Sequence, residues 1–292
     1  MQQGDWVRRL SVGLPLALLL GGMLLFAPSE LVLVLMGLII VLAGYEWGEL
    51  SGRNGILSAA VQLFVLGALW FLTDLFPTLY FSLFVLLACA WIYAIYEILA
   101  TERAGSLAEH APWSSSFAFG SLLLSGTFVS FKYLLSVQPS TLEVQLPSAW
   151  LGIAFSRWLL LWVVSTVALA DIGGYIAGKV WGKRQLVPVL SKGKTWEGMV
   201  GAFVLGMLPG FVLLLVLDWL FGIVLVCFAA ALVGFSLYGD LWESMAKRYA
   251  NVKDSGRLLP GHGGILDRLD SHLLAFALAA CVIALRALLL VI

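Results

Sequence analysis

Nine long apolar runs occupy most of this chain, and they constrain its fold more than any other feature of the sequence. They cover approximately residues 10–26, 31–46, 57–75, 79–99, 115–135, 157–178, 198–217, 219–238 and 271–291. A helix needs roughly 20 apolar residues to cross a bilayer, and lipid offers no partner to an unpaired backbone group. We therefore expect an all-α, polytopic integral membrane protein with about nine transmembrane helices. The seventh and eighth runs are nearly continuous and could instead form one broken or re-entrant unit.

The composition supports a membrane protein and excludes a soluble core. The mean hydropathy is +0.99, and only 12% of the residues are charged. The first apolar run lacks a small-residue cleavage site and leads straight into further apolar sequence, so we expect no cleavable signal. The three cysteines, Cys89, Cys227 and Cys281, lie in apolar runs without paired spacing and are expected to be small buried residues.

The basic residues predict the orientation of the helices. With a cytoplasmic N-terminus, all but three of the 17 lysines and arginines fall in cytoplasmic segments. The three exceptions are Lys132, Arg157 and Arg286, near the outer ends of their helices, where long side chains can reach the interface. We expect an extracytoplasmic C-terminus and an active site on the cytoplasmic face. The length and the lack of a targeting segment suggest a bacterial inner membrane.

Two cytoplasmic segments, about 179–197 and 239–270, are long enough to carry chemistry. We divide the chain into an N-terminal region, 1–135, with about five spans, and a C-terminal catalytic region, 136–292, which contains both segments. The second segment contains a dense set of charged side chains: Asp240, Glu243, Asp254, Asp267, Asp270, Lys247, Arg248, Lys253, Arg257 and Arg268. Carboxylates bind divalent metal, whereas cations and Gly-rich backbone bind phosphate. The combination predicts a site for a metal–polyphosphate substrate.

Asp267 and Asp270 are three residues apart at the entry to the last span, so they share one helix face. Both could bind one cation or a pair of cations. The alternative is capping of the helix N-terminus, where acids interact favourably with the helix dipole. Capping explains one acid better than two, so we favour the metal site.

The segment Pro260–Gly264 reads P-G-H-G-G, a tight turn whose N–H groups could face an anion. His262 could donate a hydrogen bond to phosphate or only hold the turn. Upstream, a polar stripe of Asp240, Glu243, Ser244 and Lys247 follows helical spacing. A solvated face is the alternative for this stripe, above all for Glu243. Asp240 ends an apolar run, a depth at which acids are usually functional.

Asp171 lies inside the sixth apolar run, near Gly173, Gly174 and Gly178, which would permit close helix packing. An acid at that depth needs a cation, a metal or a hydrogen bond from another helix.

The loop Ser191–Gly198 places Lys194 and Thr195 just ahead of a helix start, where a phosphate can bind. It is not a P-loop, since the required upstream glycine and the preceding strand are absent.

Taken together, these residues resemble the phosphatidate cytidylyltransferases, also called CDP-diacylglycerol synthases. The family signature is matched at Ser244, Lys247-Arg248, Lys253-Asp254, Gly256, Pro260–Gly264, Asp267-Arg268 and Asp270. Further similarity lies in Gly239–Ser244, in Lys194–Gly198, at Asp171 and in Glu46-Trp47 with Leu50-Ser51. The resemblance covers most of the chain and is strongest from about residue 165. Lys192 and Ile172 depart from the family, which has proline and Ser or Thr at these positions.

The resemblance implies transfer of the cytidylyl group of CTP to phosphatidate, which gives CDP-diacylglycerol and pyrophosphate for phospholipid synthesis. It implies Mg²⁺, with a second, monovalent cation such as K⁺ left open. The implied metal ligands are Asp240, Asp254, Asp267 and Asp270. The residues implied to bind triphosphate or lipid phosphate, or to line the substrate site, are Asp171, Lys194, Thr195, Ser244, Lys247, Arg248, Lys253, Gly261, His262, Gly263, Gly264 and Arg268.

The implied partners are the two substrates and membrane lipid, without nucleic acid, and a homodimer is left open. A CTP-dependent polyprenol or phytol kinase is the main alternative function. A secondary transporter would also carry acids within helices. It would not usually need D-R-L-D beside P-G-H-G-G in a cytosolic loop, and the sequence shows no inverted repeat.

Overall fold

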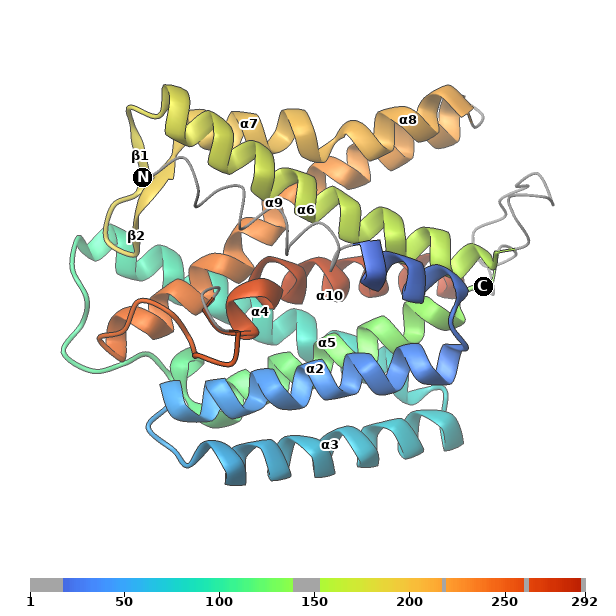
Figure 1. Ribbon diagram of the computed structural model, residues 1–292, viewed down its shortest axis with the longest axis horizontal. Helices are drawn as coiled ribbons and strands as arrows, with labels where there is room; N and C mark the ends of the chain where they lie inside the picture. Colours follow the sequence, from blue (N-terminus) through green and yellow to red (C-terminus); the bar gives the residue numbers. More distant parts are fainter. Residues whose placement is uncertain (1–17, 139–152, 217–218, 260–262, 290–292) are drawn as a thin grey trace.

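The computed structural model describes residues 18–138, 153–216, 219–259 and 263–289 (Figure 1). Residues 18–26 are helical. The helices that follow are α2 (Ser29–Leu50), α3 (Gly55–Leu75), α4 (Leu79–Ala104), α5 (Phe117–Ser136), α6 (Phe155–Trp181), α7 (Trp196–Gly206), α8 (Leu208–Val216), α9 (Trp219–Tyr249) and α10 (Leu266–Leu289). A 3-10 turn, η1 (Trp113–Ser115), precedes α5, and two short strands, β1 (Gln185–Val187) and β2 (Ser191–Thr195), precede α7.

Eight helical segments in the described part of the chain are long and apolar enough to cross a membrane. They coincide with the second to ninth apolar runs of the sequence, which confirms an all-α polytopic membrane fold. The first expected span, 10–26, falls largely outside the described residues, so the count of nine stays a prediction. Several helices, such as α4, α6 and α9, are longer than their apolar runs, because their C-terminal ends continue into polar sequence.

The seventh apolar run is a broken helix. It forms α7 and α8, which are separated at Met207. Pro209 lies in the first turn of α8, where its missing N–H group is tolerated, but it removes the donor that a continuous helix would need. The segment then turns back, and α8 packs against α9.

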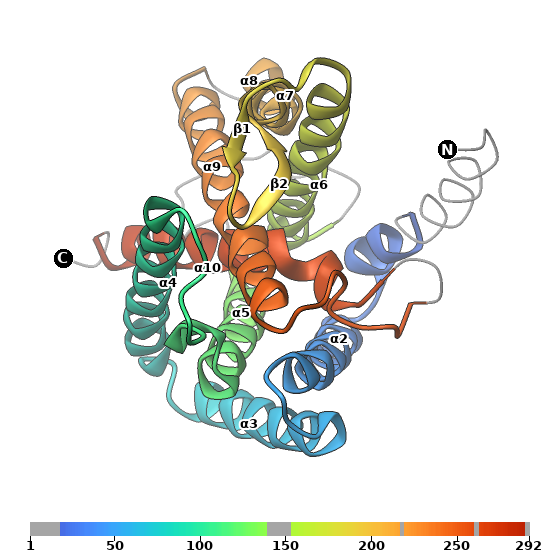
Figure 2. The ribbon, with the colours of Figure 1, turned by 90° about the vertical axis from the view of Figure 1, so that its left-hand side faces the viewer.

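The helices form two groups on either side of α10 (Figure 2). Helices α2 to α5 make one group, α6 to α9 make the other, and α10 packs against α9, α6, α5, α4 and α2. Small side chains such as Ala275, Ala277, Ala279 and Ala280 are buried along α10, which lets its neighbours approach closely. Helix α10, whose first turns carry Asp267 and Asp270, is therefore the central helix of the fold.

Helices α6 and α7 are in close backbone contact. A Cβ atom added at Gly173 would collide with the carbonyl oxygen of Gly201, and one added at Gly201 would collide with Ala177. This confirms that Gly173 permits close helix approach, as its sequence context predicts.

The segment between α6 and α7 forms an antiparallel hairpin rather than the loop that we expected. Strands β1 and β2 pair with Gln185 opposite Thr195 and Val187 opposite Ser191. Residues 188–190 make the turn between the strands, with Pro188 at its first position. Thr195 is the N-cap of α7, where its Oγ1 accepts a hydrogen bond from the N–H of Gly198 at 3.1 Å.

Candidate active site

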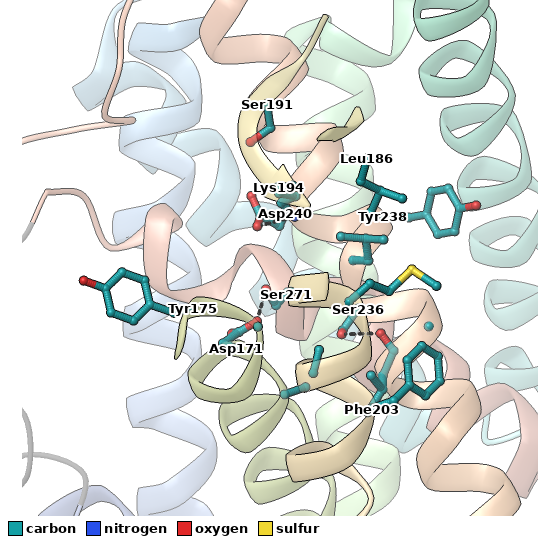
Figure 3. Close-up of a pocket in the computed structure, with 18 of the residues that line it drawn as sticks. Asp171, Tyr175, Leu186, Ser191, Lys194, Phe203, Ser236, Tyr238, Asp240 and Ser271 are labelled. Carbon is teal, nitrogen blue, oxygen red and sulfur yellow. Dashed lines mark hydrogen bonds and ion pairs between the residues drawn. The ribbon is translucent and has the colours of Figure 1, made fainter. Parts of the chain in front are cut away.

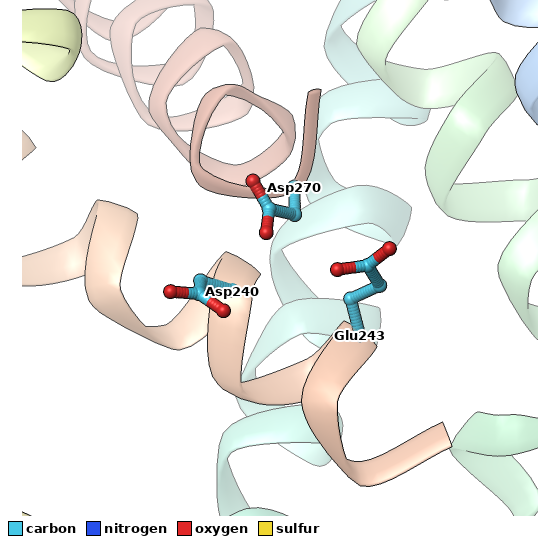
Figure 4. A group of neighbouring side chains, drawn as sticks. All are labelled: Asp240, Glu243 and Asp270. Carbon is cyan, nitrogen blue, oxygen red and sulfur yellow. The ribbon is translucent and has the colours of Figure 1, made fainter. Parts of the chain in front are cut away.

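Three carboxylates from two helices converge where the C-terminal part of α9 meets the first turn of α10. Asp240 and Glu243 come from α9, Asp270 comes from α10, and one oxygen of each lies within 4.8 Å of the others. Figure 4 shows the three side chains near one another, Asp240 and Glu243 on one helix and Asp270 on the other. We call these three residues the carboxylate group.

The backbone of α9 and α10 brings this group together. Asp240 and Glu243 are three residues apart and share the face of α9 that packs on α10. Immediately before them, Gly239 contacts the backbone of α10, and a Cβ atom at Gly239 would collide with the carbonyl oxygen of Asp270. Only glycine allows the two helices to approach this closely, so Gly239 determines the separation of Asp270 from Asp240.

Two lysines partly balance the negative charge. Lys194 of β2 pairs with Oδ2 of Asp240 at 2.5 Å, and the hydroxyl of Ser244 donates to Oδ1 of Asp240 at 3.2 Å. Lys247 Nζ donates to Glu243 at 2.6 Å and to Asp267 at 2.7 Å. The polar stripe predicted on α9 is therefore confirmed as one connected helical face.

A solvated face for Glu243 is wrong, because its side chain is 0% exposed. The first turn of α10 packs over this part of α9, so an acid expected to face the cytosol is enclosed between helices. Its Oε1 atom is buried without a hydrogen-bond partner among the described residues. A buried carboxylate oxygen without a partner is costly, and two other carboxylates lie beside it, so the group fits a bound cation.

Asp267 has different contacts from Asp270, although the two share a helix face. Its carboxylate accepts the Lys247 ammonium, the N–H of Ser255 at 3.0 Å and the N–H of Gly264 at 2.7 Å. These bonds tie the loop before α10 to the start of that helix. Asp270 instead accepts the N–H of Ser271 at 2.7 Å and faces the other carboxylates.

The structure does not bring Asp254 into the carboxylate group. Asp254 and Lys253 are exposed in the loop that follows α9. Arg268 is also exposed on the first turn of α10. Gly263 adopts a positive φ of 82°, and Gly264 is buried. Gly261 and His262 lie outside the described residues, so their expected contact with phosphate stays a prediction.

Asp171 of α6 faces the same site from the opposite side. Its Oδ1 accepts a hydrogen bond from the hydroxyl of Ser271 on α10 at 3.3 Å. Both residues line a cavity with the carboxylates of Asp240 and Asp270 and the ammonium of Lys194 (Figure 3). The acid within the sixth apolar run therefore belongs to the candidate site.

The cavity has a volume of about 730 Å³ and lies among α6, α7, α9, α10 and the hairpin. Its charged end holds the acids and Lys194, together with Ser191 and Thr195 of β2. Its remaining wall is apolar and comes mainly from Ala202, Phe203, Ala231, Val233 and Phe235. A cavity of this kind can receive a molecule with a phosphorylated head and an apolar body.

Arg248 and two further acids have roles that sequence reasoning missed. The Nε atom of Arg248, expected to bind phosphate, donates to the carbonyl oxygen of Leu190 at 3.1 Å. Glu46 of α2 is fully buried, and its Oε2 accepts the N–H of Leu266 at the start of α10 at 2.8 Å. Glu102 of α4 accepts two N–H groups of the hairpin turn. The sequence marked Glu46 only through its place in the resemblance to the family, which assigned it no role.

Comparison with known proteins gives a consistent assignment. A model described as the cytidylyltransferase family matches residues 7–286. The phosphatidate cytidylyltransferase of Pseudomonas aeruginosa is 33% identical over 264 residues, which cover 88% of each chain. That of Staphylococcus haemolyticus is 35% identical over 195 residues, 63% of this chain and 74% of the relative. That of Haemophilus influenzae is 44% identical over 121 residues, 39% of this chain and 41% of the relative.

Proposed function

This chain belongs to the cytidylyltransferase family, and we propose from this premise that it is a phosphatidate cytidylyltransferase. It transfers the cytidylyl group of CTP to phosphatidate, and the products are CDP-diacylglycerol and pyrophosphate. The observation that supports this function best is the cavity, because one end carries Lys194 and two members of the carboxylate group, Asp240 and Asp270, while the rest of its wall is apolar. A soluble nucleotide triphosphate and a membrane lipid can meet in such a space.

The reaction needs no protein nucleophile. A phosphate oxygen of phosphatidate attacks the α-phosphorus of CTP, the bond from that phosphorus to the β-phosphate oxygen breaks, and pyrophosphate leaves. The main barrier is the approach of two anions and the charge that develops on the leaving group. Catalysis of phosphoryl transfer is therefore largely positioning and electrostatic stabilisation.

Lys194 is the side chain best placed to contact the phosphates. It lies at the charged end of the cavity, on the strand that leads into α7, and its pairing with Asp240 holds the ammonium in position. The N-terminus of α7 directly follows, and its backbone N–H groups favour anions. Lys247 is instead held between Glu243 and Asp267, so we assign it to holding the carboxylates in place.

We propose that the carboxylate group holds Mg²⁺. The three acids offer oxygen ligands within 4.8 Å of one another, and the unpartnered Oε1 of Glu243 fits a metal ligand. Bound Mg²⁺ would neutralise charge on the phosphates of CTP. Relative to the ligand set implied by the family resemblance, this adds Glu243 and assigns Asp267 to organising the loop. If a second, monovalent cation such as K⁺ binds, the carboxylate of Asp171 would be one of its ligands.

The acyl chains of phosphatidate would lie along the apolar wall formed by α6, α7 and α9. Phe203 and Phe235 line that wall, and Asp171 marks its border with the charged end. In this arrangement the lipid phosphate and the triphosphate both reach Lys194. From the distribution of the basic residues along the chain, we expect the charged end to lie in the cytoplasm, where CTP is available, with the N-terminus inside and the C-terminus outside. We expect the membrane to be a bacterial inner membrane.

Labelled CTP tests the function directly. Purified protein in phosphatidate-containing liposomes is supplied with Mg²⁺ and with CTP labelled at either the α- or the γ-phosphate. Cytidylyl transfer carries only the α-label into lipid and releases pyrophosphate. Incorporation of the γ-label would identify a lipid kinase instead, and failure to label lipid with either substrate would contradict both enzymatic functions.

A further inference from the structure

The turn of the β1–β2 hairpin is held by charged side chains from two helices. Glu102, near the C-terminal end of α4, accepts the N–H of Val189 at 3.3 Å through Oε2 and the N–H of Leu190 at 2.8 Å through Oε1. Arg248 of α9 donates its Nε hydrogen to the carbonyl oxygen of Leu190 at 3.1 Å. The side chain of Leu190 is 0% exposed. The N–H, the carbonyl and the side chain of this one residue are thus all anchored.

The opposite end of the hairpin is attached to α7. Trp196 N–H donates to the carbonyl oxygen of Arg184 at 3.0 Å, and Glu197 accepts the N–H of Lys183 at 3.0 Å. A two-stranded hairpin on its own is marginally stable at best in water. Strand β2 therefore depends on both attachments, α7 at Thr195 and the Glu102 contact at Leu190.

Strand β2 supplies the cytoplasmic edge of the cavity. Ser191, Gly193, Lys194 and Thr195 all line it, and Lys194 pairs with Asp240. Leu190, which Glu102 anchors, directly precedes Ser191, the first residue of β2. Displacement of the turn would move the strand that carries Lys194.

We propose that Glu102 is a positioning residue, which acts through the hairpin turn to hold β2 and Lys194 against the charged end of the cavity. The proposal rests on the proposed function, because that function assigns Lys194 to binding the phosphates of CTP. Glu102 lies on a helix of the N-terminal group, outside the lining of the cavity. The Glu102 side chain therefore connects the group α2 to α5 with the β1–β2 hairpin.

The chain provides a matched control on the same helix. Glu97, five residues earlier on α4, also accepts two consecutive backbone N–H groups, from Trp113 at 3.2 Å and Ser114 at 2.9 Å. Those residues belong to η1, which does not line the cavity. Glu97→Gln therefore removes a charge from a similar anchor, which holds η1 and, through a hydrogen bond from Tyr93, its own helix, but no residue of the cavity lining.

The first measurement is hydrogen exchange and needs no substrate. Glu102→Gln and Glu102→Ala should raise the exchange rate of a peptide covering residues 186–192 by roughly tenfold or more, because Ala removes the acceptors of both protected N–H groups and Gln removes one of them. Glu97→Gln should leave this peptide unchanged and affect the peptide that contains Trp113 and Ser114. Unaltered exchange of the turn in both Glu102 variants would overturn the anchor.

The second measurement is CTP kinetics in a double-mutant cycle. Glu102→Gln should raise KM for CTP by roughly three- to tenfold with a smaller change in kcat, and should add little in a Lys194→Ala background. A merely structural role would lower the amount of folded protein and give additive effects in the cycle, which would refute the positioning role. A wild-type protein without cytidylyl transfer would refute the proposed function, while the exchange measurement would still test the anchor.

Discussion

Asp270→Asn separates a metal site from a structural acid, because the two roles predict opposite changes in stability. The carboxylates of Asp270, Asp240 and Glu243 have oxygens within 4.8 Å of one another. At an effective dielectric constant of about 20, two unit charges at about that distance repel by roughly 3.5 kcal/mol. Asp270 enters two such pairs, and Lys194 and Lys247 offset part of the repulsion. In the absence of a divalent cation, removal of this charge should therefore stabilise the fold.

With Mg²⁺ present, we expect the wild-type protein to be more stable than Asp270→Asn. A ligand that binds only the folded protein adds about 2.7 kcal/mol at a concentration of 100 times its dissociation constant. The wild-type protein should gain melting temperature on addition of Mg²⁺, and Asp270→Asn should lose most of this gain. Turnover should fall by orders of magnitude, since the variant retains the shape of the side chain but lacks the anionic ligand.

The assay is thermal unfolding in detergent with EDTA or with Mg²⁺, followed by labelled-CTP turnover on the same samples. Asp267→Asn is the matched control, because that carboxylate is bonded to Lys247 and to two loop N–H groups. It should lower the melting temperature both with and without Mg²⁺. The reasoning fails if Asp270→Asn melts below the wild type in EDTA and keeps the full Mg²⁺-dependent stabilisation.

Three further outcomes follow from the site and the topology. Lys194→Ala should cost roughly 1.5–3 kcal/mol of transition-state binding, so that kcat/KM for CTP falls by about one to two decades while folding is retained; unchanged CTP kinetics would exclude this lysine from the site. In a cysteine-free background, Val252→Cys should react with an impermeant thiol reagent only after the cytoplasmic side is opened, whereas Thr78→Cys should react in intact cells; the reverse pattern would invert the orientation. Glu46→Ala should lower stability by about 1–3 kcal/mol, because it leaves the N–H of Leu266 without its buried acceptor; an unchanged melting temperature would contradict this role.

The sequence alone predicts the membrane-spanning architecture well, because the signal is local. Each apolar run has the length of a bilayer and must become a helix to pair its backbone groups, whatever it packs against. Eight of the expected spans are present in the described residues. The helix start after Thr195 was also predictable, since a threonine cap ahead of an apolar run is a local signal.

The sequence predicted which residues belong to the site better than it predicted which of them are buried. The spacing of Asp240, Ser244 and Lys247 correctly indicates one face of α9. The same spacing cannot distinguish a face in water from a face under another helix. Glu243 was misjudged for this reason, because the helix that covers it begins at Leu266, more than 20 residues further along the chain.

The sequence by itself determined a helical membrane bundle, the family, and the types of charged side chain that gather in its two polar segments. Only the tertiary structure decided that Asp270 meets Asp240 and Glu243 while Asp267 ties down a loop, although the two aspartates share one helix face. It also decided that Glu102, on a helix outside the cavity lining, holds the hairpin that carries Lys194. Helical periodicity gives the direction of a side chain from its own axis, whereas its partners depend on where two axes cross. That crossing is determined by contacts between distant segments, such as Gly239 against the backbone of Asp270.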